Sequence, residues 1–204
     1  MQFAQKIPKE QIVSQLATQL TWSHIIEVLP VKVSLAVEFY LTMSSSGRWG
    51  RNRLRKEIDS MLFERTAIAT KPDELIKKEL ADLRDDSNMS PDLVFKSPYF
   101  LDFTGLKGMY SEKSLEDSLV AHLEQFILEL GNGFTFVERQ KRMIIDGEDF
   151  YLDLLFFHRK LHRLIAIDLK LGRFKAQYKG QMELYLRWLE AHEMEPGEEP
   201  PLGL

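Results

Sequence analysis

The sequence predicts an all-helical N-terminal domain followed by a C-terminal α/β domain. Two observations lead to this fold class. Over roughly the first hundred residues, apolar residues recur mainly at spacings of three and four, which is typical of amphipathic helices. After Gly108 the pattern changes to one helix, three strand-like segments and a second helix. We therefore expect two domains, 1–108 and 109–204.

The N-terminal part contains five helical patterns, which are punctuated by Pro30, by residues 44–47 and by Pro72. They are QIVSQLATQL, SHIIEVL, VSLAVEFYLTM, NRLRKEIDSMLFERTAI and DELIKKELADL. Residues 90–106 are rich in aromatic residues and predict a packed connector. The basic stretch RWGRNRLRK could contact a DNA backbone. A solvated amphipathic face explains it slightly better, because the acidic segment EIDSMLFER follows and offsets the charge.

The C-terminal part begins with one amphipathic helix from Ser111 to Leu130, which Gly131-Asn132-Gly133 ends. FTFVERQ and FYLDLLFFH predict two strands joined by a turn at IDGED, and RLIAIDLK predicts a third strand after the hairpin turn HRKLH. A second helix is predicted from Ala176 to about His192. The last four residues resemble the beginning of a further, incomplete strand.

Composition excludes several functional classes. The chain has 204 residues, no cysteine and a net charge of -4. Disulfides, thiolate metal sites and cysteine nucleophiles are therefore excluded, and a cytoplasmic location is expected. No apolar run is long enough to span a membrane, and the N-terminus lacks a signal-peptide core. The acidic balance means that nucleic-acid binding would require a local basic patch.

Three carboxylates occur within apolar sequence patterns, where burial of a charged group is energetically unfavourable. On a helical wheel Glu116 falls inside the apolar arc of its helix, and Asp153 and Asp168 belong to apolar strands. Asp153 is expected on the same face as Tyr151, Leu155 and Phe157. A buried, unpaired carboxylate costs several kcal/mol, so each needs a cation, a proton or a partner. Lys170 could form a simple ion pair with Asp168, but a divalent metal accounts for all three. Oxygen ligands without cysteine suit Mg²⁺ or Mn²⁺.

These residues carry a resemblance. Asp153, with Asp168-Leu169-Lys170 on the next strand, resembles the D…(D/E)xK signature of the PD-(D/E)xK nuclease superfamily. The segment from Gln181 to Tyr185 is similar to the QxxxY motif of its RecB-like branch. Longer blocks resemble the bacterial YhcG-type family, which joins a helical N-terminal domain to a PD-(D/E)xK domain. These blocks include LTWSHIIEVLP, SPDLVFKSPYFLDFTGL, FILELGNGFTFVERQ and YKGQMELYL. The chain departs from that family at Asp168, where Glu is usual, at Glu138, where Gly is frequent, and by stopping before a final strand.

The resemblance implies a restriction-endonuclease-like core and a metal-dependent nuclease that acts on DNA, in bacterial DNA processing or defence. Under it, Mg²⁺ or Mn²⁺ is held by Asp153, Asp168, the Leu169 carbonyl and Glu116. Lys170 orients or deprotonates the attacking water, and Gln181 supports it. The residues expected to contact nucleic acid are Arg139, Arg173, Lys175, Lys179 and Tyr185.

Other interpretations remain open. Glu116 could simply favour the helix dipole, Gln181 could be a surface amide, and Tyr185 could be a core residue. The basic residues after Lys170 could form a solvated turn. His158 and His162 flank a hairpin, where histidines are usually exposed. A non-catalytic module that binds nucleic acid or protein is the competing function, and the helical half could also drive homo-oligomerisation.

Overall fold

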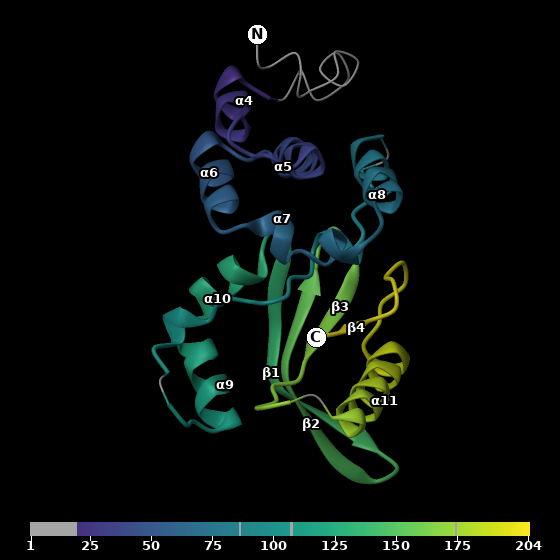
Figure 1. Ribbon diagram of the computed structural model, residues 1–204. Coiled ribbons are helices and arrows are strands. Elements are labelled where there is room, and N and C mark those ends of the chain that lie inside the picture. The colour runs from purple at the N-terminus through teal and green to yellow at the C-terminus, as the bar shows by residue number, and fades with distance from the viewer. Residues whose placement is uncertain (1–19, 86, 107, 174) are drawn as a thin grey trace. The chain divides into compact units, whose positions relative to one another are not determined.

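The computed structural model describes residues 20–85, 87–106, 108–173 and 175–204, and the chain divides into two compact units, Met1–Tyr99 and Phe100–Leu204 (Figure 1). Most of the first predicted helix, residues 11–19, lies outside the described residues. The predicted domain ranges, 1–108 and 109–204, stay a prediction. No helix in the described part of the chain is both long and apolar enough to cross a membrane.

The described part of the first unit is built from helices. They are α4 (Trp22–Val28), α5 (Ser34–Gly47), α6 (Arg51–Asp59), α7 (Leu62–Arg65), η1 (Ala67–Thr70), α8 (Asp73–Asp85) and η2 (Pro91–Leu93). Helix α5 is its centre, because apolar residues on several sides of this helix are buried. The Tyr40 hydroxyl accepts a hydrogen bond from the Phe63 amide, which anchors α7 to α5.

The expectation of one helix over NRLRKEIDSMLFERTAI is wrong. Helix α6 ends at Asp59, and Met61 has a φ of 52° before α7 begins. A residue in the left-handed region cannot continue a right-handed helix. The periodicity of apolar residues therefore continues along the sequence although the helix is interrupted.

The second unit contains the mixed sheet. Its elements are η3 (Asp102–Thr104), α9 (Glu112–Ala121), α10 (Leu123–Leu130), β1 (Phe134–Ile145), β2 (Glu148–His158), β3 (Arg163–Ile167), α11 (Ala176–His192) and β4 (Leu202–Gly203). The sheet order is β1-β2-β3-β4, with antiparallel pairs except for the parallel pair of β3 and β4. The predicted order of helix, three strands and helix is confirmed, and the last residues form a short fourth strand.

Helices cover both faces of this sheet (Figure 1). On one face Phe126 of α10 makes an edge-on ring contact with Phe156 of β2. On the other face Tyr185 of α11 belongs to a buried cluster with Leu155 of β2 and Ala166 of β3. The unit is therefore a three-layer α/β sandwich, consistent with the predicted restriction-endonuclease-like core.

The first helix of this unit differs from the prediction. The single helix expected from Ser111 to Leu130 is divided at His122, whose φ of -114° and ψ of 37° lie outside the helical region. The His122 ring nitrogen Nδ1 lies 3.0 Å from the carbonyl oxygen of Ser118, which also accepts the His122 backbone amide at 3.1 Å. Neither glycine nor proline marks the position, so sequence punctuation could not reveal it.

The β1–β2 hairpin is set by a two-residue turn. Asp146 and Gly147 both have positive φ values, 51° and 83°, as a type I′ turn requires. Pairing from Ile145 with Glu148 fixes the register along the hairpin, apart from one irregularity between Phe136 and Glu138. This turn therefore decides which residues of β1 lie opposite the motif residue Asp153.

Candidate active site

Asp153 and Asp168 meet at one end of the β2–β3 ladder. The last pair before this end joins Leu154 to Ile167, and the same register continued by one step places Asp153 opposite Asp168. Directly opposite residues of antiparallel strands have Cβ atoms about 5 Å apart. The predicted third strand is shorter than expected, since β3 ends at Ile167 and Asp168 is the first residue after it. Two acidic side chains are thus brought together from neighbouring strands.

Asp153 accepts two hydrogen bonds. The Leu169 amide donates to Oδ2 at 2.7 Å, and the Gln140 side-chain amide donates to Oδ1 at 3.0 Å. Burial raises the pKa of Asp153 above its ordinary value, and the charge of Asp168 adds to this against the hydrogen bonds from Leu169 and Gln140. The charged form of Asp153 is therefore disfavoured until a further positive charge approaches.

Lys170 lies against Asp168. Its ammonium nitrogen is 2.9 Å from each carboxylate oxygen of Asp168, whose side chain is 6% exposed. Burial alone lowers the pKa of Lys170, but the hydrogen bond to Asp168 and the charges of Asp168, Asp153 and Glu112 outweigh it, so the pKa is raised. Lys170 is consequently held as an ammonium group. The simple ion pair considered from the sequence is present, but it leaves Asp153 without a cation of its own.

The strands change face at Asp153. Phe150 contacts the Tyr185 ring, and Phe157 packs against the same cluster, although strict alternation would separate them. The pairing register of β1 and β2 runs from Arg139–Leu154 to Lys141–Leu152, and Gln140 between them has a φ of 51°. The expectation that Asp153 shares one regular face with Tyr151 and Leu155 is therefore wrong, because the backbone bends where Gln140 lies opposite Asp153.

Glu116 is buried, as its place on the helical wheel predicts, and 5% of it is exposed. In the structure Arg139 of β1 binds it, with Nε 2.6 Å from Oε1, and Arg139 also pairs with Asp117. Within residues 20–85, 87–106, 108–173 and 175–204, no three acidic or histidine side chains are close enough together to hold a metal. The structure thus pairs the two aspartates and holds Glu116 in a separate ion pair. A ligand role for Glu116 stays a prediction.

The oxygen donors of this site fit a hard divalent cation. Mg²⁺ in proteins commonly takes only one or two carboxylates and completes its shell with water and substrate phosphate. Asp153 and Asp168 supply two carboxylates, and the carbonyl of Leu169, the residue between Asp168 and Lys170, lies 3.4 Å from the Lys170 ammonium. Burial, and after it the charge of Asp168, raise the pKa of Asp153, so a bound cation would favour its charged form.

Two residues at the site were missed from the sequence. Glu112 lies one turn before Glu116 on α9, and its carboxylate accepts the Leu171 amide at 3.0 Å. Gln140 contacts Asp153 directly. Glu112 reads locally as an ordinary first-turn acid, whereas Gln140 could have been found by counting the hairpin register back from the Asp146-Gly147 turn.

Gln181 and Tyr185 contact each other. The Gln181 amide donates to the Tyr185 hydroxyl at 2.6 Å, as their spacing on α11 allows. Tyr185 is buried in the core and packs on Phe150, so a packing role is certain for it. The support of Lys170 by Gln181 and the contact of Tyr185 with nucleic acid stay predictions.

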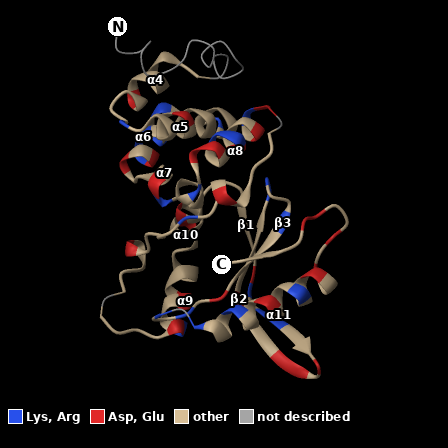
Figure 2. Ribbon diagram, turned by 45° about the vertical axis from the view of Figure 1, so that its right-hand side comes forward, with Lys and Arg blue, Asp and Glu red and all other residues tan. Residues whose placement is uncertain are grey.

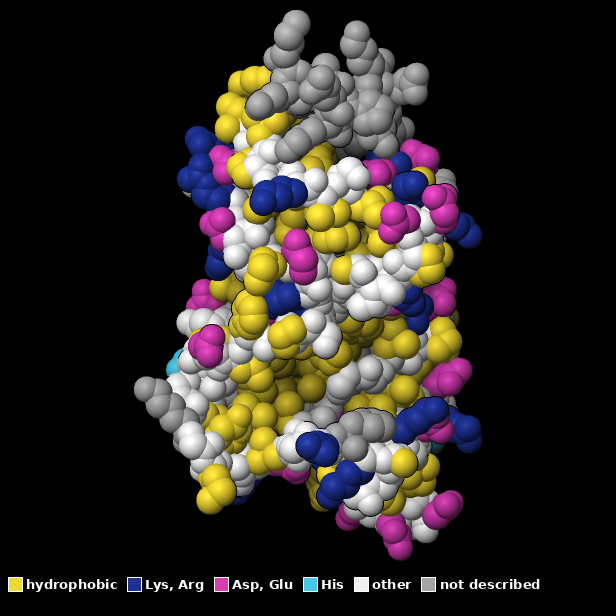
Figure 3. All heavy atoms as spheres, in the orientation of Figure 1, with side chains coloured by type: hydrophobic (Ala, Val, Ile, Leu, Met, Phe, Trp, Pro, Cys, Tyr) yellow, Lys and Arg dark blue, Asp and Glu magenta, His cyan; other side chains and the backbone are white. Residues whose placement is uncertain are grey.

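A pocket of about 550 Å³ opens beside the motif, between the segment after β3, helix α11 and strand β4. Its lining residues are Asp168, Lys170, Gly172, Arg173, Tyr178, Lys179, Met182, Glu183, Leu186, Gly203 and Leu204. Lys and Arg residues gather in this part of the unit, as the coloured ribbon marks (Figure 2), and their side chains appear in the space-filling view (Figure 3). Among the described residues neither Arg173 nor Lys175 has an acidic side chain within ion-pair distance, whereas Lys179 lies 3.7 Å from Glu183.

The histidines of the β2–β3 hairpin have separate environments. His162 is exposed, as expected, but His158 is fully buried. The Leu161 amide donates to its Nδ1, and its Nε2–H donates to the Asn132 carbonyl, each at 3.1 Å. Burial lowers the pKa of His158 to about 4. The expectation of an exposed turn histidine is wrong for His158, because its ring fills the core next to Phe134.

The basic stretch of the first unit is largely neutralised. Arg51 and Arg55 of α6 both bind the Glu27 carboxylate of α4, and these hydrogen bonds, from Arg55 and then Arg51, lower the pKa of Glu27 to about 2. Arg53 lies over the Trp49 ring and pairs with Glu57. Two of these three arginines, Arg51 and Arg55, are therefore paired with an acid of α4, and Arg53 pairs with an acid of the segment that follows them.

Comparisons with known proteins were made over the whole chain. The model of the DUF1016 N-terminal domain matches residues 1–65, and that of the YhcG PDDEXK nuclease domain matches residues 92–204. A protein of Escherichia coli (strain K12) named "Putative nuclease YhcG" is 36% identical over 194 residues, which cover 95% of this chain and 51% of that protein. The chain thus spans about half the length of the curated relative it matches. No solved structure matches.

Proposed function

The chain belongs to the family of the YhcG PDDEXK nuclease domain, and from this premise we propose that it is a divalent-metal-dependent nuclease that hydrolyses phosphodiester bonds of DNA. The observation that carries the proposal is the juxtaposition of Asp153, Asp168 and Lys170 at one end of the sheet. Two carboxylates in one place, of which Asp153 has a raised pKa, have little structural benefit beside a fixed ammonium group but suit a cation and a phosphate.

Asp153, Asp168 and the Leu169 carbonyl would hold the cation, Mg²⁺ or Mn²⁺. When bound, the cation supplies Lewis-acid polarisation of the phosphodiester. The Leu169 amide and Gln140 fix the Asp153 carboxylate, so that it need not reorganise during the reaction. Glu116 is proposed as a further ligand that is released from Arg139.

Lys170 is proposed to orient the attacking water and to stabilise negative charge on the phosphate. Its raised pKa favours the charged form, which suits this electrostatic role better than proton abstraction. Gln181, on the following helix, is proposed to support Lys170 or a phosphate oxygen.

The segment that leads into α11 is proposed to contact phosphates. Lys175 is the N-cap residue of α11, it makes no side-chain cap, and the first turn contains no acidic residue. A cation at the positive end of a helix dipole is unfavourable by some tenths of a kcal/mol. Arg173, Lys175 and Lys179 all lie near this end, so the local charge suits an incoming anion. Arg139 and Tyr185 remain proposed contacts with weaker support.

The helical N-terminal domain is proposed to select nucleic acid or a protein partner, and a homo-oligomer through this domain is a further proposal. Bacterial DNA processing or defence in the cytoplasm is the expected setting. Static light scattering on the whole chain tests the oligomer, since a monomeric mass would contradict it.

The test of catalysis is cleavage of labelled DNA with Mg²⁺ or Mn²⁺, with and without EDTA. We expect cleavage by the chain to require the metal and to disappear in Asp168→Asn and Lys170→Met. Asp149→Asn is the matched control, because Asp149 lies on β2, the strand of Asp153, and within the described part of the chain it pairs only with the exposed Arg142. Salt-sensitive DNA binding without cleavage, unchanged by both motif variants and by EDTA, would instead favour a non-catalytic binding module.

A further inference from the structure

The pocket beside Lys170 has a composition that phosphate contacts alone do not require. We propose that it binds one unpaired nucleotide of the substrate, so that the nuclease prefers single-stranded or locally unpaired nucleic acid to a fully paired duplex. This inference rests on the proposed function and adds the substrate class. A volume of about 550 Å³ lies within the range of small-molecule pockets, about 300–1,000 Å³.

The pocket lining combines apolar and charged side chains. Met182 and Leu186 of α11, with Leu204 after β4, are apolar, whereas Asp168, Lys170 and Arg173 are charged. Gly203 also lines the pocket, and a Cβ at this position would come within 2.4 Å of the Met182 side chain. A lining that contains both apolar and cationic side chains suits a flat base with its phosphate attached, since phosphates alone need no apolar surface.

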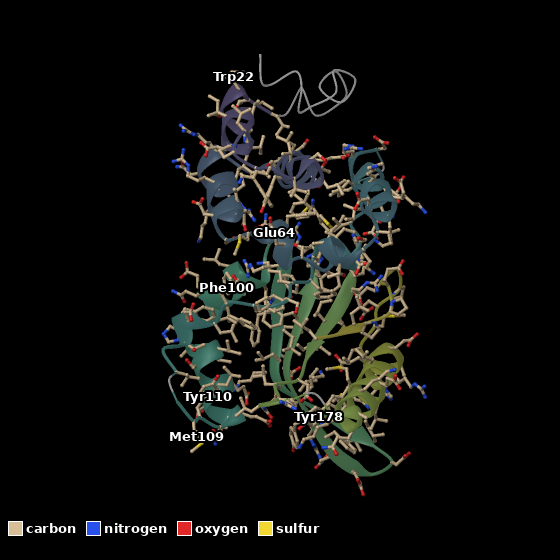
Figure 4. The ribbon with its side chains drawn as sticks, viewed as in Figure 1. Trp22, Glu64, Phe100, Met109, Tyr110 and Tyr178 are labelled. Carbon is tan, nitrogen blue, oxygen red and sulfur yellow. The ribbon has the colours of Figure 1, made fainter. Side chains whose placement is uncertain are left out.

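Tyr178 supplies an aromatic surface in this pocket. Its side chain extends from the first turn of α11, in the part of the unit where β3 ends (Figure 4). Lys170 and Lys175 lie over the ring with nitrogens 5.9 and 5.7 Å from its centroid. These distances are near the limit of about 6 Å for a cation–π contact, so both lysines keep positive charge near the ring. A base can stack on such a ring whatever its identity.

The position of Asp168 connects the pocket to the chemistry. Asp168 lines the pocket and also lies opposite Asp153 in the continued register. A nucleotide with its base against Tyr178 would therefore carry its phosphate toward the aspartate pair and Lys170. Arg173 and Lys175, which have no acidic partner among the described residues, would then face the neighbouring phosphates of the same strand.

A paired base cannot enter a pocket of this kind. It would first have to leave its helical stack, which costs a few kcal/mol in a perfect duplex and less at a mismatch, flap or single strand. Substrates with an unpaired nucleotide should therefore bind more tightly.

The experiment measures binding of the whole chain in EDTA, where no cleavage occurs. Three probes share one strand that contains the fluorescent base 2-aminopurine: the free strand, its perfect duplex, and a duplex in which that base is unpaired. We expect the free strand and the unpaired probe to bind at least about tenfold more tightly than the perfect duplex, with a change in fluorescence as the base meets the ring.

Tyr178→Ala should remove about tenfold of this preference, whereas Tyr178→Phe should keep it, because a phenylalanine ring still stacks. Met182→Trp places a larger side chain among the lining residues, so it should fill part of the pocket and reduce the preference similarly. Equal affinity for the three probes, or a preference unchanged in both Tyr178→Ala and Met182→Trp, would overturn the inference.

The two proposals fail separately. Metal-dependent cleavage of perfect duplex without any preference for unpaired probes would support the proposed nuclease function and contradict the proposed nucleotide pocket. A clear preference for unpaired probes, with no cleavage in Mg²⁺ or in Mn²⁺, would support the proposed nucleotide pocket and contradict the proposed nuclease function.

Discussion

Asp153 and His158 are polar residues of the same strand, β2, and the structure treats them in opposite ways. His158 is fully buried, and both of its ring nitrogens have backbone partners that fit one neutral tautomer. Asp153 is partly buried, and its two hydrogen bonds do not prevent a rise of its pKa beside Asp168. One group has its hydrogen-bonding capacity satisfied within the chain, whereas the other retains charge that the chain does not neutralise.

This difference separates a structural polar residue from a functional one. A buried polar group with complete hydrogen bonds contributes to a unique fold. A carboxylate held next to another carboxylate lowers stability unless something binds between them. Substitution of Asp153 should therefore reduce activity and not stability, whereas substitution of His158 should reduce stability and not activity.

The largest expected effect is on catalysis by Asp153→Asn. The asparagine oxygen can still accept the Leu169 amide, and the repulsion from Asp168 disappears. We therefore expect the cleavage rate to fall about a thousandfold, or about 4 kcal/mol in activation free energy. The free energy of unfolding without metal should stay the same or rise. Retained cleavage, or a clear loss of stability in denaturant unfolding, would contradict the comparison.

The converse effect is expected for His158→Ala. Loss of a buried ring and two hydrogen bonds should lower the free energy of unfolding by about 3 kcal/mol. Cleavage per folded molecule should not change. Denaturant unfolding measures the first quantity, and a cleavage rate corrected for the folded fraction measures the second.

The control for this change is His162→Asn. His162 is exposed and has a φ of 48°, which asparagine tolerates better than most residues. Stability should change by less than about 0.5 kcal/mol. A similar loss at both positions would mean that the buried hydrogen bonds of His158 carry no special weight.

Lowering the pH should reveal the structural role of His158 as a loss of stability. The pKa of His158 is about 4 in the folded chain, against an ordinary value of 6.5. Between these values the unfolded chain binds more protons than the folded chain, so stability falls as the pH is lowered. His158 alone should remove about 2 kcal/mol between pH 6.5 and pH 4.5. Unfolding measured across this range should show a shallower loss in His158→Gln, and an identical loss in both proteins would contradict the assignment.

Apart from the His162 control, the smallest expected effect is at Lys175. Lys175→Asp provides a capping carboxylate at the beginning of α11 and removes a cation from the positive end of the dipole. Stability should rise by about 1 kcal/mol. DNA binding should weaken, and its dependence on salt should become less steep. Lys175→Gln, which removes the charge without adding a cap, should weaken binding with little gain in stability; unchanged binding in both variants would exclude Lys175 from the interface.

Much of the fold could be predicted because it depends on local patterns. Alternation identified the strands, the Asp146-Gly147 turn fixed the hairpin, and spacing defined α11, which begins at Ala176 and ends at His192. The motif residues Asp153, Asp168 and Lys170 are together, as the sequence indicated, since two adjacent antiparallel strands bring them to the same end.

The remainder depends on contacts between distant residues. The face change at Asp153 requires an unusual backbone at Gln140, which belongs to another strand. The pairing of Glu116 with Arg139 joins α9 to β1, and apolar periodicity on one helix cannot predict which cation will meet an acid. His158 is buried because Asn132 and Leu161 supply its partners.

The most direct test of the central claim is calorimetric titration of Mn²⁺ into the whole chain without nucleic acid. The account predicts one binding site per chain that is lost in Asp153→Asn and in Asp168→Asn but kept in Asp149→Asn. Binding that survives both motif substitutions would show that these two carboxylates do not share a cation, and the proposed catalytic site would be wrong.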